Sequence, residues 1–152
     1  MLKKLKIILI SLLFLLVMAC SNEFARQEYN SNEKISLMND HYAKEFSVFN
    51  STNEEISLTI SKFNGRETLW TKKLDKNRDI EINLSFRLSK GQAKIVHIDN
   101  DNNVTTIIEC VPDTSTDGFV TKTISLKSGQ NRLKIVGYDC ENIDVKIEFS
   151  KL

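Results

Sequence analysis

The chain is poor in residues that interrupt pleated structure and in residues that carry most enzyme chemistry. Its 152 residues include one proline, five glycines, one tryptophan and two histidines. It contains no G-x-S-x-G sequence, no glycine-rich phosphate loop and no paired-carboxylate motif. His41 and His97 lie far apart and neither has a nucleophile setting beside it. The sequence therefore predicts no catalytic residues, no metal site and no cofactor, and favours a protein that is not an enzyme.

Neither basic nor acidic residues predominate in the sequence. The chain has 21 basic and 20 acidic residues, a formal net charge of +1. Because basic and acidic residues are nearly equal in number, the chain has no extended basic surface of the kind that binds nucleic acid. The composition therefore excludes nucleic acid as a partner. No apolar run reaches the length of about 20 residues that a transmembrane helix needs.

The N-terminus has the layout of an export signal. Three lysines within the first six residues precede an apolar run at 7–19, which closes with Val17-Met18-Ala19-Cys20. A basic head, a short apolar core and a small residue before a cleavage point are typical of such signals. The sequence turns polar immediately after Cys20, as expected of a mature N-terminus.

Val17-Met18-Ala19-Cys20 resembles the lipobox of bacterial lipoproteins. The resemblance implies cleavage after Ala19 and a diacylglyceryl group on Cys20, so that acyl chains such as palmitate anchor the protein to a membrane. Two acyl chains suffice for stable anchoring. The expected location is the extracytoplasmic side of a bacterial cell envelope, and the alternatives are an ordinary secretory signal or an uncleaved anchor. Cleavage leaves 133 residues with 18 basic and 20 acidic side chains, a net charge of −2.

Behind the signal peptide (1–19), the composition predicts two parts. Residues 20–44 are rich in Asn, Glu and Ser with few apolar side chains, which predicts a lipidated Cys20 followed by a polar, flexible tether. A short helical turn at 33–40 is compatible with this segment. Residues 45–152 alternate between apolar and polar and predict the folded domain.

The alternation predicts about nine short strands and no helical block. In Asp79–Leu88 every second residue is apolar, which indicates a half-buried strand. Asn64-Gly65 predicts a tight hairpin turn between two strands. Strands are expected at 46–50, 56–60, 67–74, 79–88, 93–99, 104–110, 119–126, 132–138 and 143–149. Short strands at this spacing predict an all-β fold, an antiparallel β-sandwich of immunoglobulin-like or jelly-roll-like type.

Cys110 and Cys140 are the cysteines left after Cys20, and they permit two interpretations. A disulfide between them would close a loop of roughly 30 residues and contribute about 3–4 kcal/mol. Alternatively, both are buried free thiols that pack as small hydrophobic groups.

The Asp and Asn residues at 99–103 resemble the start of an EF-hand calcium loop, with oxygen ligands at alternate positions. The loop requires Gly at its sixth position and Glu at its twelfth, whereas Val104 and Cys110 stand there. The run therefore predicts a polar hairpin tip.

Trp70 is predicted to be a core residue or a half-buried anchor. The functional alternative is an aromatic platform, made by Trp70 with Tyr138, for stacking on a sugar. Aromatic rings suit this role because they offer a large contact area and lose little rotamer entropy.

The part after Cys20 looks like the small β-sandwich ectodomains of bacterial surface lipoproteins, a resemblance of fold that identifies no ligand. The leading hypothesis is a membrane-anchored binding or interaction module whose partner is an envelope protein or a polysaccharide. The alternatives are an envelope enzyme acting on glycans and a structural subunit of an envelope complex.

Overall fold

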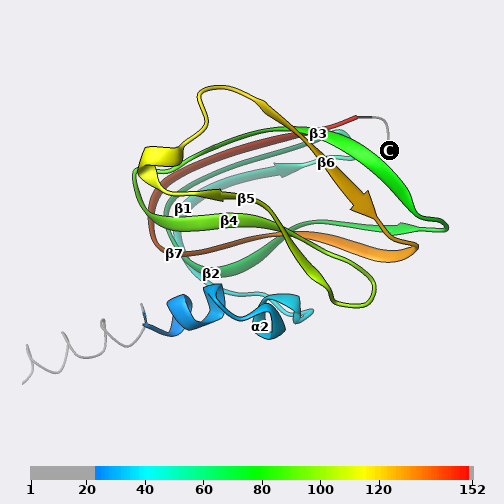
Figure 1. Cartoon of the computed structure of the whole chain (residues 1–152). Coiled ribbons are helices and arrows are strands. Elements are labelled where there is room, and N and C mark those ends of the chain that lie inside the picture. The colour runs from blue at the N-terminus through cyan, green and yellow to red at the C-terminus, as the bar shows by residue number, and fades with distance from the viewer. Residues whose placement is uncertain (1–22, 151–152) are drawn as a thin grey trace, which may run out of the picture.

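The computed structural model describes residues 23–150, which form an antiparallel β-sandwich (Figure 1). The predicted all-β class is confirmed. The strands are β1 (His41–Ser51), β2 (Glu55–Leu74), β3 (Arg78–Arg87), β4 (Lys90–Ile98), β5 (Val104–Cys110), β6 (Val120–Leu126) and β7 (Gly129–Phe149). Helical structure within the described range comprises residues 23–29, α2 (Asn32–Ser36) and the 3-10 turn η1 (Pro112–Thr114).

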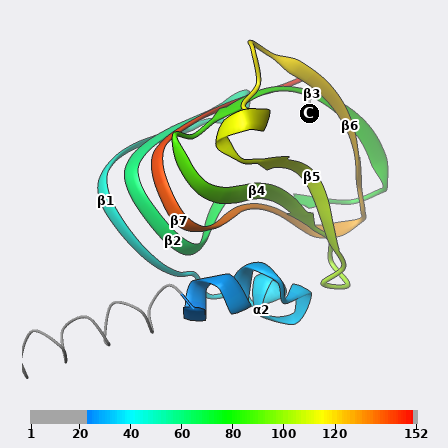
Figure 2. The same cartoon turned by 60° about the vertical axis from the view of Figure 1, so that its left-hand side comes forward.

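Strands β2 and β7 bend and pass through both layers of the sandwich (Figures 1 and 2). The five-strand layer has the order β1, first half of β2, second half of β7, β3, β6. The four-strand layer has the order second half of β2, first half of β7, β4, β5. All pairings are antiparallel, and each layer ends at two lateral edges. At one edge β1 lies over the second half of β2, and this edge carries the candidate site described below.

The alternation seen in the sequence separates core from solvent. On β3, Ile82, Leu84 and Phe86 are fully buried, while the residues between them are exposed or half-buried. Both halves of β2 and of β7 contribute to one core cluster, with Ile56 and Leu133 as members from opposite layers. Burial of one such side chain contributes about 1.5–3 kcal/mol, so the inward rows stabilise the bent sheet.

The predicted hairpin at Asn64-Gly65 is wrong, because β2 continues through it as a β-bulge. Gly65 has φ +112°, and a Cβ there would lie 2.1 Å from the carbonyl oxygen of His41 on β1. The Asn64 side-chain oxygen accepts the backbone N–H of Asp139 on β7 at 2.7 Å, and Asp139 itself has φ +52°. Both long strands therefore bend at the same level.

This continuity changes the strand count. The predicted strands 56–60 and 67–74 are halves of β2, and 132–138 and 143–149 are halves of β7. Nine predicted segments thus become seven strands.

The described part of the predicted tether, residues 23–44, is packed against the sandwich. Tyr29 and Ile35 are 3% and 0% exposed, and they form a second apolar cluster with Val96, Ile98 and Val136 on the outer face of the four-strand layer. The last residues of the predicted tether, from His41 onward, belong to β1. The prediction of a flexible segment fails here because these few apolar side chains meet an apolar patch made by distant strands.

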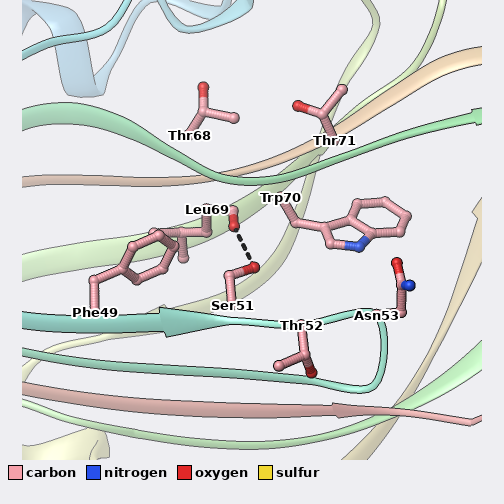
Figure 3. Close-up of a pocket in the computed structure, with 8 residues that line it drawn as sticks. All are labelled: Phe49, Ser51, Thr52, Asn53, Thr68, Leu69, Trp70 and Thr71. Atoms are coloured by element: carbon pink, nitrogen blue, oxygen red, sulfur yellow. Dashed lines mark hydrogen bonds between the residues drawn. The ribbon is translucent and has the colours of Figure 1, made fainter.

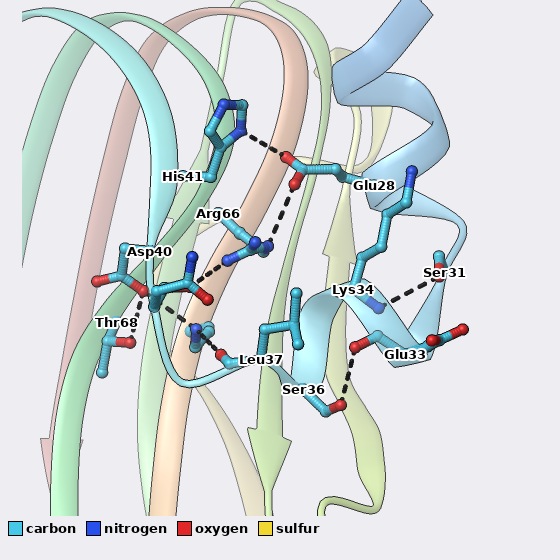
Figure 4. Close-up of polar contacts among 12 residues, drawn as sticks. Glu28, Ser31, Glu33, Lys34, Ser36, Leu37, Asp40, His41, Arg66 and Thr68 are labelled. Atoms are coloured by element: carbon cyan, nitrogen blue, oxygen red, sulfur yellow. Dashed lines mark hydrogen bonds and ion pairs between the residues drawn. The ribbon is translucent and has the colours of Figure 1, made fainter.

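Buried polar contacts also hold this segment (Figure 4). Arg66 pairs with Glu28 at 3.3 Å, and Glu28 also contacts His41 at 3.0 Å. Lys134, with 0% of its side chain exposed, donates to the Asp40 carboxylate at 3.1 Å. A buried ammonium group requires such partners, so β7 and the N-terminal segment depend on each other.

Candidate functional site

The candidate site is an open depression of about 520 Å³ between the end of β1 and the second half of β2 (Figure 3). It lies at the lateral edge where the two layers approach each other. Its lining residues are Phe49, Ser51, Thr52, Asn53, Thr68, Leu69, Trp70 and Thr71.

A β-bulge on β2 places Trp70 in this depression. The register with β7 shifts between Thr68 and Trp70, and as a result the consecutive residues Leu69 and Trp70 both face the core, with 3% and 7% exposure. The indole stacks on the ring of Phe149 from the opposite layer, with centroids 5.1 Å apart and planes 23° apart. This contact fixes the ring at the mouth of the depression.

The turn between β1 and β2 forms the other wall. The Thr52 hydroxyl oxygen accepts the backbone N–H groups of Glu54 and Glu55 at 3.2 and 3.0 Å, which closes the turn. The Ser51 hydroxyl donates to the carbonyl oxygen of Leu69 at 3.2 Å and joins the turn to β2. Asn53, at the tip, is exposed and its amide points toward the Trp70 ring (Figure 3).

The lining is polar and uncharged. None of the eight side chains titrates near neutral pH. Within residues 23–150, the Asn53 amide and the Trp70 indole N–H have no hydrogen-bond partner, so both are available to a ligand. The depression therefore offers the small exposed part of the indole, its N–H donor and an amide side by side, and it contains no group for acid–base catalysis.

Tyr138 does not join this site. It lies on the outer face of the four-strand layer, where its hydroxyl donates to the Gln92 side-chain oxygen at 2.8 Å and its ring packs edge-on against Tyr29 at 5.2 Å. Trp70 belongs to the core cluster on the other side of the sheet. The two rings form no joint platform because their side chains leave opposite faces of the four-strand layer.

Cys110 and Cys140 are buried free thiols in the structure. Burial raises the pKa of both thiols, that of Cys140 to about 12. The Cys140 thiol donates to the carbonyl oxygen of Gln92 at 3.2 Å, and Cys110 contacts the carbonyl oxygen of Phe86 at 3.5 Å. Cys20, the predicted lipidation residue, lies outside the described residues.

The remaining titratable candidates serve local structure. His97 is buried on β4, with Nε2 2.9 Å from the side-chain oxygen of Asn131. The Asp99 carboxylate accepts the backbone N–H groups of Asp101 and Asn103, each at 2.9 Å, and so closes its own hairpin. Burial alone would raise the pKa of Asp99, but the hydrogen bond from the Asn103 side chain at 2.9 Å, together with the two backbone N–H groups, outweighs burial and lowers that pKa. Residues 23–150 hold no group of three or more His, Cys, Asp or Glu side chains placed to share a metal ion.

Sequence reasoning singled out Trp70 but missed its neighbours Ser51, Thr52 and Asn53. The Ser-Thr-Asn run had the composition of a turn, and nothing in the sequence indicated that this turn faces Trp70. Their proximity depends on the bend of β2, which the sequence had suggested to be a hairpin.

No helix formed by residues 23–150 combines the length and apolar character needed to cross a membrane.

Comparisons with known proteins give a likeness of fold only. No family model matches the chain, and no curated protein matches its sequence. An exo-β-1,3-galactanase from Phanerochaete chrysosporium aligns with a TM-score of 0.41 and 10% identity over 75% of this chain, which spans only 30% of the galactanase. A carbohydrate binding module of Cellvibrio mixtus lichenase 5A aligns with a TM-score of 0.42 and 9% identity, covering 74% of this chain and 90% of that one.

A pre-peptidase C-terminal domain of a Bacillus anthracis collagenase aligns similarly, with a TM-score of 0.39, 9% identity and coverage of 73% of this chain and 89% of that one. Superpositions this loose assign neither an activity nor a site to the chain.

Proposed function

We propose that this protein is a lipid-anchored binding module of a bacterial envelope, and that its ligand site is the depression beside Trp70. The anchor is supported by the N-terminal sequence pattern that ends at Cys20. The binding role is supported by the uncharged lining, which offers contacts to a ligand and no group that could act as general acid or base.

The ligand that suits this lining best is a neutral sugar chain. A sugar ring has hydroxyl groups that accept from an N–H and exchange hydrogen bonds with an amide, and its C–H groups can contact the small exposed part of the Trp70 indole, which is 7% exposed. The observation that carries the proposal is the adjacency of the Trp70 indole and the Asn53 amide, neither bonded to another described residue (Figure 3). An anionic ligand would find no cation in the lining.

The test is a glycan array probed with the domain 21–152, followed by calorimetry with the sugars that bind. Asn53→Ala should weaken binding about 3- to 10-fold, because one hydrogen bond contributes about 0.5–1.5 kcal/mol. Trp70→Phe keeps an aromatic ring against Phe149 and removes the N–H donor, so it should weaken binding by a similar factor. Thr59→Ala, at an exposed position of β2 outside the depression, is the control and should bind normally. If both variants bind the sugar as tightly as the parent protein does, the sugar-binding site lies outside the depression.

Lipid attachment has its own test. Mass spectrometry of the N-terminal peptide should show two or more acyl chains on Cys20, and Cys20→Ser should release the protein from membranes. An unmodified thiol at Cys20 in membrane-bound protein would refute the anchor.

A second candidate function, a subunit that binds an envelope protein, is favoured by the β1 edge. Phe46 is 90% exposed with φ +42°, and Val48 is 72% exposed. Exposed apolar residues on a sheet edge mark a docking site for another chain. Phe46→Ser should then abolish capture of that protein from envelope extract, while Phe119→Ser, at another exposed Phe, should not.

A further inference from the structure

The N-terminal segment 23–38 has two sides with different environments. One side, with Tyr29 and Ile35, packs on the outer face of the four-strand layer. Three apolar residues of the same segment remain partly exposed: Leu37 by 45%, Met38 by 63%, and Phe24 by 45%, although the Phe24 ring also packs edge-on against His41 with centroids 5.1 Å apart. These three residues are called the apolar ledge below.

The sandwich holds the ledge in place. The Arg132 guanidinium donates to the carbonyl oxygens of Ser36 and Leu37 at 2.8 and 3.1 Å, and the Lys134 ammonium donates to that of Leu37 at 2.7 Å. Arg132 and Lys134 are 3% and 0% exposed. Three charge-assisted hydrogen bonds to two adjacent carbonyl groups fix the backbone there, so the exposed Leu37 and Met38 side chains cannot fold back onto the sheet without breaking them.

The proposed anchor lies very close to this ledge in the sequence. Cys20 precedes the first described residue, Glu23, by three positions, and an extended chain spans at most about 3.6 Å per residue, or roughly 11 Å in total. An amphipathic surface segment penetrates the headgroup region by about 5–10 Å. A lipid on Cys20 therefore brings the bilayer within reach of the segment that carries the ledge.

We propose that the apolar ledge rests in the headgroup region of the membrane that holds the Cys20 lipid, so that the domain sits on the bilayer in one orientation. This inference rests on the proposed lipid anchor. The occupant is a bilayer surface because the chain ahead of Glu23 is too short for the domain to stand away from it. The four-strand layer then lies toward the membrane, and the five-strand layer and the loop before β6 lie away from it (Figures 1 and 2).

Charges of both signs lie beside the ledge, among them the exposed acidic residues Glu23 and Glu33. The Lys34 ammonium lies 5.0 Å from the centroid of the Phe24 ring, and Arg26 is exposed on the same helical stretch. Basic groups next to apolar side chains suit the boundary between phosphate groups and acyl chains.

The test uses the processed, lipidated protein in vesicles of phosphatidylcholine and phosphatidylglycerol with brominated acyl chains, which quench nearby indoles. Trp70→Phe removes the native tryptophan, and Met38→Trp places a reporter on the ledge. Its emission should fall about twofold or more relative to unbrominated vesicles, since a ledge inserted by about 5–10 Å reaches the upper acyl carbons. Leu37→Trp is a second reporter and should behave in the same way.

Phe119→Trp is the matched control. Phe119 is 50% exposed, comparable to the ledge residues, and it belongs to the loop before β6, on the side opposite α2 (Figure 2). Its emission should not change with bromination. Equal quenching at both positions, or none at either ledge position, would overturn the inference.

Flotation of the vesicles and the mass of the N-terminal peptide distinguish failure of the ledge proposal from failure of the lipid-anchor proposal. Vesicles that float with acylated protein but leave both ledge reporters unquenched would refute the ledge and leave the anchor standing. A Cys20 without acyl chains would refute the anchor, and the ledge with it.

Discussion

Replacement of Ile35 by alanine tests whether the N-terminal segment is part of the folded domain. Ile35 is 0% exposed and packs in the cluster of Tyr29, Val96, Ile98 and Val136. Truncation of a buried Ile to Ala costs about 2–5 kcal/mol, depending on how far the site collapses. This cluster lies under a short surface segment that can settle into the gap, so we expect the lower half of that range, about 2–3 kcal/mol.

Two measurements are needed because the segment can detach before the sandwich unfolds. Urea unfolding followed by circular dichroism reports the whole domain, and hydrogen exchange at 32–36 reports the segment itself. The Ile35 N–H donates to the carbonyl oxygen of Ser31 at 2.9 Å, so its exchange is slow only while α2 is docked. Ile35→Ala should accelerate this exchange by about 30- to 150-fold, the equivalent of about 2–3 kcal/mol, whether or not the global midpoint shifts.

Met38→Ala is the control, because Met38 is 63% exposed and surface changes usually stay within about 0.5 kcal/mol. If amides at 32–36 exchange at unprotected rates in the parent protein, or if both variants behave alike, residues 23–40 are the flexible tether that the composition suggested.

Three further perturbations follow from the structure. Gly65→Ala should destabilise the domain by about 2 kcal/mol or more, because it adds a Cβ against the backbone of β1 at a positive φ; an unchanged urea midpoint would contradict the bulge. Although burial alone would raise the pKa of Asp40, the hydrogen bonds that its carboxylate accepts from Thr68 and from Lys134 lower it. A lowered folded-state pKa adds stability above the unfolded pKa near 4, and this stability is lost as pH falls through the folded value. Asp40→Asn should therefore reduce stability at neutral pH and flatten its decline below about pH 4; an identical pH profile would argue against this pairing. The Cys110 and Cys140 thiols should resist a thiol reagent in the native state and both react in urea, because burial raises their pKa values; rapid labelling of the native protein, or a mass deficit of two hydrogens that disappears on reduction, would contradict two buried free thiols.

The sequence predicted the sandwich well because its strands are amphipathic. Buried and solvent-facing residues alternate along β3 and along the second half of β7. This alternation is a local property of the sequence, so it can be recognised without knowing the tertiary contacts. The bend at Gly65 could not be predicted in the same way. An Asn-Gly pair suits a hairpin and a bulge equally, and only the approach of β1 and the bond from Asp139 to Asn64 select the bulge.

The N-terminal segment and the depression could not be predicted for a related reason. Ile35 looked isolated in a polar stretch, and its partners come from β4 and β7. Lys134 is a charged residue within the predicted strand 132–138, yet it is fully buried and bonded to a carbonyl group 97 positions earlier. Asn53 and Trp70 meet only because β2 folds over. Contacts between distant segments carry no local sequence signal.

The most direct test of the central claim is the fluorescence of Trp70 during titration with the neutral oligosaccharides that bind on the array. Because the chain has a single tryptophan, every change in emission reports the ring in the depression. We predict a saturable change whose midpoint matches the calorimetric affinity and moves to higher sugar concentration in Asn53→Ala. Calorimetric binding with no change in Trp70 emission would show that sugars bind away from the depression and would contradict the account.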